Sequence, residues 1–223
     1  MSSIKIDPLE SQFIEEPTDA VGLSFGELAE RAAALTLLSV ASPVIAASAA
    51  AVAVLSGRSP FIAHLRVGRN GKSFWTLKLR TMWNQGERRG KPEWIEYIVA
   101  EPSDDAKDPA DPRVVSRFAA FCRRHSIDEL PQLWHVVRGE MSLVGPRPLT
   151  RSELTRHYGA HAAEILSVKP GITGLWQVNG RSAVRFPRRS VMDLELVRTL
   201  TPRMYLRILL RTLPAVILGS GSW

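Results

Sequence analysis

An uncharged run of 24 residues near the N-terminus restricts the fold of this chain more than any other feature. It extends from Ala32 to Leu55 and reads AAALTLLSVASPVIAASAAAVAVL. A helix of this length can cross the hydrocarbon core of a bilayer, which is about 30 Å thick. A signal peptide would need basic residues before the run, and the residues there are acidic, so the sequence predicts a retained membrane segment.

Pro43, preceded by Ser42, lies at the middle of this run. Proline removes an intrahelical hydrogen bond and bends or breaks a helix, which leaves two apolar arms of about 11–12 residues. Arms this short suit a re-entrant hairpin with both ends on one side of the membrane. The basic residues after the run, such as Arg58 and Arg66, satisfy the positive-inside rule for a single crossing. The residues alone leave both topologies open.

Charge is distributed unevenly along the chain. The formal net charge is +7, but residues 1–30 hold seven acids and one lysine, so this segment is −6 and the remainder +13. A basic body favours anionic partners such as nucleic acid, acidic lipid head groups or phosphorylated substrates. The acidic segment lacks apolar periodicity and predicts a disordered tail. The single cysteine, Cys122, excludes an intramolecular disulfide.

Residues 61–83 predict a β-hairpin. Apolar and basic residues alternate on either side of an Asn-Gly pair at 70–71, which is a strong hairpin signal. The charged side chains of this hairpin are expected on exposed faces. The polar stretch 84–113 predicts a loop with a short helix around residues 94–99.

Helical periodicity appears in three further segments, at residues 113–126, 131–139 and 151–167. Near the C-terminus, Arg203, Arg207 and Arg211 are spaced four apart and form a cationic stripe on a Leu- and Ile-rich helix. Such a helix suits the head-group plane of a membrane, and equally an amphipathic contact with a protein core.

Two adjacent carboxylates, Asp128 and Glu129, stand in the stretch SIDELPQLW. One interpretation is a capping box with Ser126 as the N-cap. That register puts Pro131 inside the first turns, where its ring opposes the helix, whereas a helix beginning at Pro131 leaves both acids just outside its N-terminus. There the helix dipole stabilises anions by about 0.3–1 kcal/mol. The spacing does not decide whether the two acids cap a helix or form a reaction centre.

Several cations lie on loops or at the ends of predicted elements, namely Lys78, Arg80, Arg113, Arg123, Arg147 and Arg181. With two acids beside a membrane segment, they are what an anionic diphosphate substrate and a divalent cation require. Structural salt bridges account for part of the same set, so we expect no more than half of these cations to touch substrate. A membrane-tethered basic module that binds nucleic acid or acidic lipid is the alternative, and it needs no acidic pair.

Three ordered stretches closely resemble the bacterial sugar transferases, the monotopic polyprenyl-phosphate phosphoglycosyl transferases. They read RVGRNGKSFWTLKLRTM, DPRVVSRFAAFCRRHSIDELPQLWHVVRGEMSLVGPRP and KPGITGLWQVNGRS. The resemblance covers about residues 30–223 and is greatest to the small enzymes that begin exopolysaccharide repeat units. The chain departs from the family pattern before the membrane helix. The family usually has a Lys-Arg pair followed by Asp there, whereas this chain has Arg31 and no Asp.

The resemblance implies transfer of a sugar-1-phosphate, expected to be a hexose-1-phosphate, from a UDP-sugar to undecaprenyl phosphate, with release of UMP and with Mg²⁺ as cofactor. It implies Asp128 as the nucleophile and Glu129 as a catalytic partner associated with the metal. Nucleic acid is not an expected partner. The residues expected to bind substrate are Lys78, Arg80, Arg123, Arg147 and Arg181.

The resemblance also favours the re-entrant hairpin, with Ser42 and Pro43 matching the helix break of the family. The predicted fold class is mainly α with a small β-hairpin. It comprises an acidic, disordered tail (1–30), a re-entrant helix-break-helix (31–56) and a cytosolic catalytic domain (57–223) that ends in an interfacial helix. The expected location is the bacterial inner membrane, in contact with membrane lipid and with the catalytic domain on the cytoplasmic face. The sugar and a homo-oligomeric state are left open.

Overall fold

The computed structural model describes residues 24–83, 93–99, 114, 116–180, 183–217 and 219. The described elements, with 3₁₀ helices labelled η, are in chain order α1 (Phe25–Ser56), β1 (Phe61–Val67), η1 (Arg69–Gly71), β2 (Ser73–Leu79), β3 (Ile95–Ile98), α2 (Arg117–Arg124), η2 (Ile127–Gln132), α3 (Leu133–Arg138), β4 (Ser142–Val144), α4 (Arg151–His157), η3 (Gly159–His161), α5 (Ala162–Ile165), β5 (Gly171–Thr173), α6 (Leu175–Val178), α7 (Arg188–Thr199) and α8 (Pro202–Ile217). The prediction of a mainly helical protein with a small sheet and one long apolar helix is confirmed.

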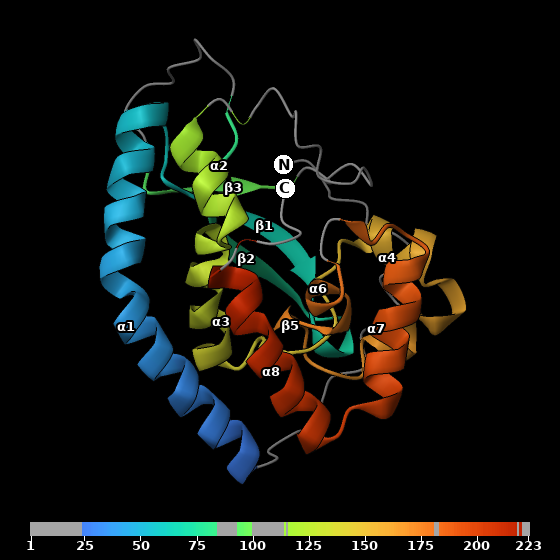
Figure 1. Cartoon of the computed structure of the whole chain (residues 1–223). Helices are drawn as coiled ribbons and strands as arrows, with labels where there is room; N and C mark the ends of the chain where they lie inside the picture. The colour runs from blue at the N-terminus through green and yellow to red at the C-terminus, as the bar shows by residue number, and fades with distance from the viewer. Residues whose placement is uncertain are drawn as a thin grey trace, which may run out of the picture.

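The uncharged run forms most of α1, which begins at Phe25, before the predicted boundary at residue 31. A capping box starts the helix, because the Ser24 side chain accepts from the Glu27 N–H and the Glu27 carboxylate accepts from the Ser24 N–H. Figure 1 shows that α1 bends along its length, and its helical conformation continues through Pro43. The expected break is therefore a bend in this structure, and the re-entrant topology stays a prediction.

By length and composition, α1 is the one candidate membrane span among the described residues. Only 17% of its most apolar window is buried inside the molecule, which is unlike the core helix of a soluble protein. Large apolar side chains are exposed on it, among them Leu35, Leu37, Val40 and Val44. This surface is available to lipid.

Acidic side chains fix the N-terminal part of α1 to the rest of the protein. The Glu30 carboxylate accepts hydrogen bonds from Ser142 Oγ (2.6 Å), from the Leu143 N–H (2.8 Å) and from the Tyr205 hydroxyl. Glu27 forms an ion pair with Lys169 at 2.6 Å. The apolar helix is therefore anchored to β4 and α8, rather than joined to them only by the chain.

The predicted hairpin is confirmed. β1 and β2 pair antiparallel from Phe61↔Leu79 to Val67↔Ser73, and η1 forms the connection, with Asn70 at a positive φ of 57°. The short helix expected around residues 94–99 is wrong. These residues form β3, which pairs in parallel with β1 to give the order β2-β1-β3. A strand that aligns with a distant partner has no local signal in its own residues.

Alternation along the strands gives this sheet one strongly polar face. His64 of β1 and Thr76 of β2 are directly opposite each other in the register and therefore lie on the same face. Arg66 and Lys78, each two positions further along its strand, lie on that face as well. Arg66 is only 6% exposed and Arg80, just beyond β2, only 4%. The expectation that the charges of the hairpin are exposed holds for Arg69 and Lys72 at the turn. It is wrong for Arg66 and Lys78, because Glu153 of α4 and Glu129 of η2 pair with them on this face.

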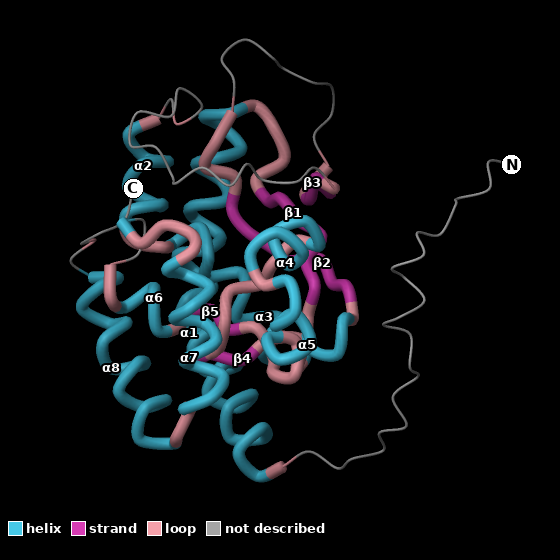
Figure 2. The backbone as a smooth tube through the Cα atoms, turned by 90° about the vertical axis from the view of Figure 1, so that its right-hand side faces the viewer, coloured by secondary structure: helices cyan, strands magenta, loops and turns pink. Residues whose placement is uncertain are grey.

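Three apolar clusters hold the elements together. The first joins α1, β2 and α3 through Ala34, Phe74 and Val136. The second lies between the end of β1 and the helices α4 and α5, and the third joins β4 to α7 and α8. Figure 1 shows the resulting arrangement, with α1 along one side of the molecule, α7 and α4 on the other, and β1 and β2 between them. Figure 2 shows β4 and β5 between α8 and β2.

Candidate active site

The 3₁₀ helix η2 carries Asp128 and Glu129 in its first turn. Ser126 precedes it with a positive φ of 55° and makes no capping side-chain hydrogen bond, so the capping box is wrong. The predicted helix start is also wrong, because Pro131 lies inside η2 and the α-helix begins at Leu133. The left-handed Ser126 turns the chain after α2 and lays the two acids against β2.

Lys78 of β2 contacts Glu129 of this acidic pair directly. Its Nζ lies 2.7 Å from Glu129 Oε1, and both side chains are about one fifth exposed or less. Asp128 is 5% exposed. Burial and, to a smaller extent, the charge of Asp128 raise the pKa of the neighbouring Cys122 thiol to about 11. The structure thus places Lys78, predicted to bind substrate, beside Glu129, the predicted metal-associated acid. Asp128, the predicted nucleophile, lies in the same turn.

The other predicted cations are placed in different ways. Arg80 donates to the Ser59 carbonyl (2.8 Å) and to Glu96 Oε2 (2.6 Å), so it also ties β1, β2 and β3 together. Arg123, 8% exposed, lies in the last turn of α2, which packs against η2. Arg181 lies outside the described residues.

His135 of α3 fixes the position of β2 next to η2. The Leu77 N–H donates to His135 Nε2 at 3.0 Å, and His135 Nδ1 lies 2.6 Å from Glu140 Oε2. Because Nε2 accepts a hydrogen bond, the proton of the ring is on Nδ1, where it is donated to Glu140. An imidazole and a carboxylate therefore hold the strand that carries Lys78 at a fixed distance from the acids.

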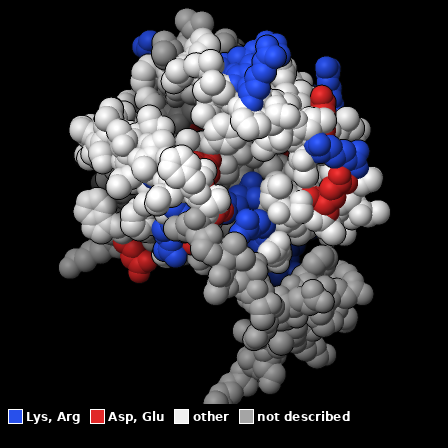
Figure 3. Space-filling model, turned by 90° about the horizontal axis from the view of Figure 1, so that it is seen from below, with Lys and Arg blue, Asp and Glu red and all other residues white. Residues whose placement is uncertain are grey.

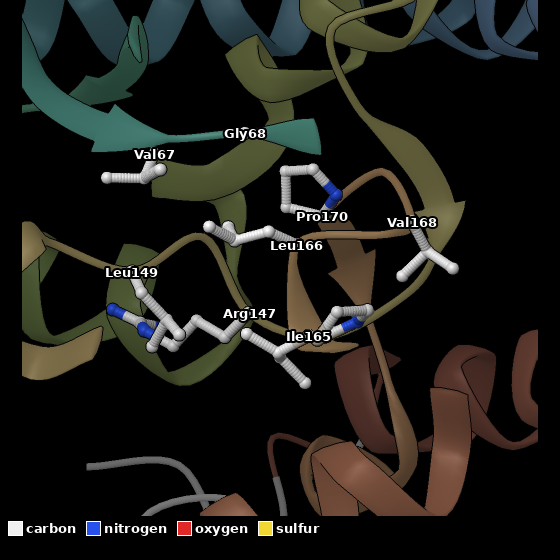
Figure 4. Close-up of a pocket in the computed structure, with 9 residues that line it drawn as sticks. Val67, Gly68, Arg147, Leu149, Ile165, Leu166, Val168 and Pro170 are labelled. Carbon is white, nitrogen blue, oxygen red and sulfur yellow. The ribbon is translucent and has the colours of Figure 1, made fainter. Parts of the chain in front are cut away.

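Arg147 lies in a second cluster of polar residues beside a small cavity. Aliphatic residues and prolines from the end of β1 and from residues 165–170 form most of the cavity lining, and Arg147 is the one charged residue among those that line it. Figure 4 shows its side chain extending past Leu149, on the other side of the cavity from Val168 and Pro170. The apolar lining packs against the aliphatic part of Arg147 and leaves the guanidinium group for polar contacts.

The surroundings of Arg147 are rich in buried charge. Arg66 and Glu153 form an ion pair at 3.0 Å with both side chains at most 10% exposed. The Tyr158 hydroxyl donates to Asp193 Oδ2 at 2.8 Å, and burial raises the pKa of Asp193 to about 7. Burial therefore favours the neutral form of this acid, close to the positive charges of Arg147 and Arg189.

His64 connects the two groups of cations. Burial has the largest effect and, together with the charges of Arg66, Lys78, Arg147 and Arg80, lowers the pKa of His64 to about 4. Lys78, Arg80 and Arg147, which the sequence predicted as active-site cations, are thus near the same imidazole. No motif in the sequence singles out His64, although the alternation along the hairpin places it on the same face as Lys78.

A magnesium ion fits the acidic pair in one particular way. Within the described part of the chain, no group of three or more His, Cys, Asp or Glu side chains is placed to enclose a metal. Mg²⁺ is often held by one or two carboxylates together with substrate phosphates and water, without a cage of protein ligands. Glu129 and Asp128 supply two carboxylates of that kind in one turn.

Comparison with known proteins identifies the family. The model of the bacterial sugar transferase family matches residues 23–219. The chain belongs to this family. The matched region includes the whole of the described structure, so α1, the acidic pair and α8 are all parts of the bacterial sugar transferase unit.

Individual relatives agree with this assignment. The chain is 39% identical over 221 residues to the exopolysaccharide production protein ExoY of Rhizobium meliloti, and the match covers 95% of both chains. It is 40% identical over 174 residues to the UDP-galactose-lipid carrier transferase of Erwinia amylovora, where the match covers 75% of this chain but 35% of the relative. A UDP-glucose:undecaprenyl-phosphate glucose-1-phosphate transferase of Caulobacter vibrioides is 34% identical over 199 residues, which is 86% of this chain and 69% of that protein.

Proposed function

We propose that this protein transfers a sugar-1-phosphate from a UDP-sugar to undecaprenyl phosphate, releases UMP and so begins the synthesis of an exopolysaccharide or a related glycan. The observation that carries the proposal is the turn of η2, where Asp128 and Glu129 lie against Lys78 at the polar face of the sheet. The names of the relatives support it, since they include a lipid carrier transferase and an undecaprenyl-phosphate sugar-phosphate transferase.

In the proposed mechanism, the reaction has two steps at one phosphorus atom. The Asp128 carboxylate attacks the sugar-bound phosphorus of the donor, the bond to the UMP oxygen breaks, and a phosphoglycosyl-aspartate forms. An oxygen of the lipid phosphate then attacks the same phosphorus, and the Asp128 carboxylate leaves. One phosphoric anhydride is exchanged for another, so the transfer needs no ATP.

The cations of the site allow an anion to attack an anion. The charges of Lys78, Arg80 and Arg147 all act on His64, and in the proposed mechanism these cations neutralise phosphoryl oxygens and orient the donor for in-line attack. Lys78 also keeps Glu129 in place beside the nucleophile. When Mg²⁺ is bound by this acidic pair, it supplies further neutralisation of the diphosphate charge.

The apolar surfaces fit the proposed place of reaction. The exposed leucines and valines of α1 and the exposed Leu206, Leu210 and Leu213 of α8 suit contact with lipid. Exposed Arg203 and Arg207 on α8 suit the head-group layer. We propose that α1 enters the inner membrane as a re-entrant segment and that α8 lies at its cytoplasmic surface, where the lipid phosphate resides.

The basic binding module is the weaker alternative. On the face shown in Figure 3, Lys and Arg side chains form separate groups, several of them beside Asp or Glu, and most of the face is uncharged. Such a surface differs from the continuous basic patch that nucleic acid requires.

A panel of UDP-sugars tests the proposed function. With the purified protein, undecaprenyl phosphate and Mg²⁺, we expect UMP release from at least one of UDP-glucose, UDP-galactose and an N-acetylated UDP-sugar. Chelation with EDTA should abolish the release, and an excess of Mg²⁺ should restore it, because two carboxylates repel the diphosphate unless a divalent cation offsets their combined negative charge. Failure to release UMP from every donor would contradict the proposal.

The position of the N-terminal segment tests the topology. In a Cys122→Ala background, we expect the thiol of a Ser11→Cys variant to react with an impermeant reagent only after the cells are permeabilised. A Ser73→Cys variant, at an exposed position of the catalytic domain, provides the matched cytoplasmic control. Labelling of Ser11→Cys but not of Ser73→Cys in intact cells would show that α1 crosses the membrane completely.

A further inference from the structure

The segment that forms η2 and α3 contacts strand β2 at two neighbouring residues. Lys78 Nζ lies 2.7 Å from Glu129 Oε1 of η2, and the Leu77 N–H donates to His135 Nε2 of α3 at 3.0 Å. The first contact holds a side chain of β2, and the second holds the backbone directly before it. A shift of β2 relative to η2 therefore breaks at least one of the two contacts.

The contact with His135 is made at an open edge of the sheet. β2 is an edge strand in the order β2-β1-β3, and an edge strand has backbone N–H groups that no neighbouring strand pairs. His135 is only 6% exposed, so its ring shields the Leu77 N–H from water and is itself the acceptor for it. Phe74, also on β2, contacts the imidazole edge to face, with ring centroids 5.6 Å apart, which fixes the plane of the ring.

Glu140 determines which ring nitrogen is free to accept. Its Oε2 lies 2.6 Å from His135 Nδ1, so the proton of the ring is held on Nδ1 and Nε2 keeps its lone pair. In the other tautomer the Nε2–H would face the Leu77 N–H, donor against donor. The backbone keeps Glu140 in reach, because its N–H donates to the His135 carbonyl at 2.9 Å across a turn in which Gly139 has a φ of 81°.

We propose that His135 and Glu140 are positioning residues of the transfer reaction. They set β2 against η2 and thereby keep Lys78 beside Glu129, in the turn that carries Asp128, where the ammonium charge acts on the phosphoryl group under attack. Both act through the backbone of β2 and not by touching substrate. This inference rests on the proposed function, because the reaction is the one proposed above.

Steady-state kinetics on four variants test the pair. His135→Phe keeps an aromatic ring but removes the acceptor, and Glu140→Leu no longer selects the tautomer. We expect each to lower kcat about tenfold while KM for the UDP-sugar changes less than about threefold, because a displaced Lys78 weakens transition-state stabilisation more than donor binding. His135→Gln, whose Oε1 takes the place of Nε2, and Glu140→Gln, which still accepts from Nδ1, should stay within about threefold of wild type.

A double-mutant cycle separates positioning from a general effect on stability. If His135 acts through Lys78, the loss caused by His135→Phe should disappear in a Lys78→Met background, because the group that is positioned is already absent. All rates are measured well below the lowest Tm of the set. A residue that only stabilises the fold would lower activity by the same factor in both backgrounds, and equal factors would overturn the proposal.

The reactivity of the Lys78 amine reports the position of β2 without any need for activity. Acetylation by an N-hydroxysuccinimide ester, followed by mass spectrometry, should be slow at Lys78 in the wild type, because the side chain is 16% exposed and paired with Glu129. His135→Phe and Glu140→Leu should raise the rate by about two- to tenfold, the scale of one lost hydrogen bond. Arg138→Gln, which removes an exposed partner of Glu140, is the matched control and should change neither this rate nor kcat.

The two measurements keep this inference apart from the proposed function. If the wild type releases no UMP from any UDP-sugar but Lys78 becomes more reactive in His135→Phe and Glu140→Leu, the proposed reaction is wrong and the support of β2 by the pair stands. If the wild type releases UMP and both variants keep kcat within about threefold of wild type, the reaction stands and the positioning role is wrong, whatever the reactivity of Lys78.

Discussion

Replacement of Asp128 by asparagine is expected to lower the rate of UMP release by at least about a thousandfold, the scale on which covalent catalysis fails when its nucleophile is removed. The amide has nearly the shape of the carboxylate but no negative charge with which to attack phosphorus. Asp128 is 5% exposed within η2, so the isosteric change keeps the packing around the turn. The measurement is UMP formation under initial-rate conditions with the donor found in the UDP-sugar panel.

Two further measurements make this result specific. Without lipid acceptor, intact-protein mass spectrometry should show a sugar-phosphate adduct on the wild type and none on Asp128→Asn. Glu195→Gln, on an exposed position of α7, is the matched control and should retain full activity. Full activity of Asp128→Asn would remove Asp128 as the nucleophile, and an adduct that persists in this variant would place the covalent bond on another residue.

Glu153→Ala is expected to destabilise the protein by about 3–5 kcal/mol, because it leaves the buried Arg66 without its counter-ion. Glu153 Oε2 accepts from Arg66 at 3.0 Å and from the Thr150 N–H and hydroxyl at 2.8 and 3.0 Å. The substitution also removes half of the capping box that begins α4. Chemical denaturation of the full chain in detergent measures the change in the free energy of unfolding.

The matched control for this prediction is an exposed ion pair. Glu164 accepts two hydrogen bonds from Arg198 at 2.6 and 2.8 Å, but both side chains are largely accessible to water. Solvent screening makes such pairs weak, so Glu164→Ala should cost only a small fraction of the effect of Glu153→Ala. Equal losses would show that burial does not decide the strength of the Arg66 pair. Activity should fall as well in Glu153→Ala, since Arg66 lies near Arg147 and His64.

Features with a local physical cause could be predicted from the sequence. The Asn-Gly pair needs a left-handed residue, so it places a turn at Asn70 and fixes the register of β1 and β2. The spacing of apolar residues predicts helices where α2 and α8 lie. The ordered motifs predict the family, and the family model confirms it.

The acidic pair shows where local reasoning ends. Capping geometry and the position of Pro131 left two registers for the helix, and the structure has neither of them. The left-handed Ser126 and the 3₁₀ turn are stabilised by the packing of η2 against β2 and α1. This packing depends on residues about fifty positions away, such as Lys78, so the sequence near Asp128 holds no signal for it.

The burial of the cations could also not be predicted from the sequence. An arginine in an alternating strand is normally exposed, yet Arg66 is covered by α4 and finds Glu153 there, 87 positions further along the chain. Likewise, the charges of Lys78 and Arg147, which are far apart in the sequence, both act on His64 only in the folded protein.

The sequence by itself determined the long apolar helix, the hairpin and the family, because each depends on composition or on spacing along the chain. Only the tertiary structure decided which of those residues meet, that α1 is one bent helix fixed to the domain by Glu30, and that His64 lies among the cations. The reason is physical. Propensity and periodicity act between neighbours in sequence, whereas ion pairing and desolvation depend on which surfaces the completed fold brings together.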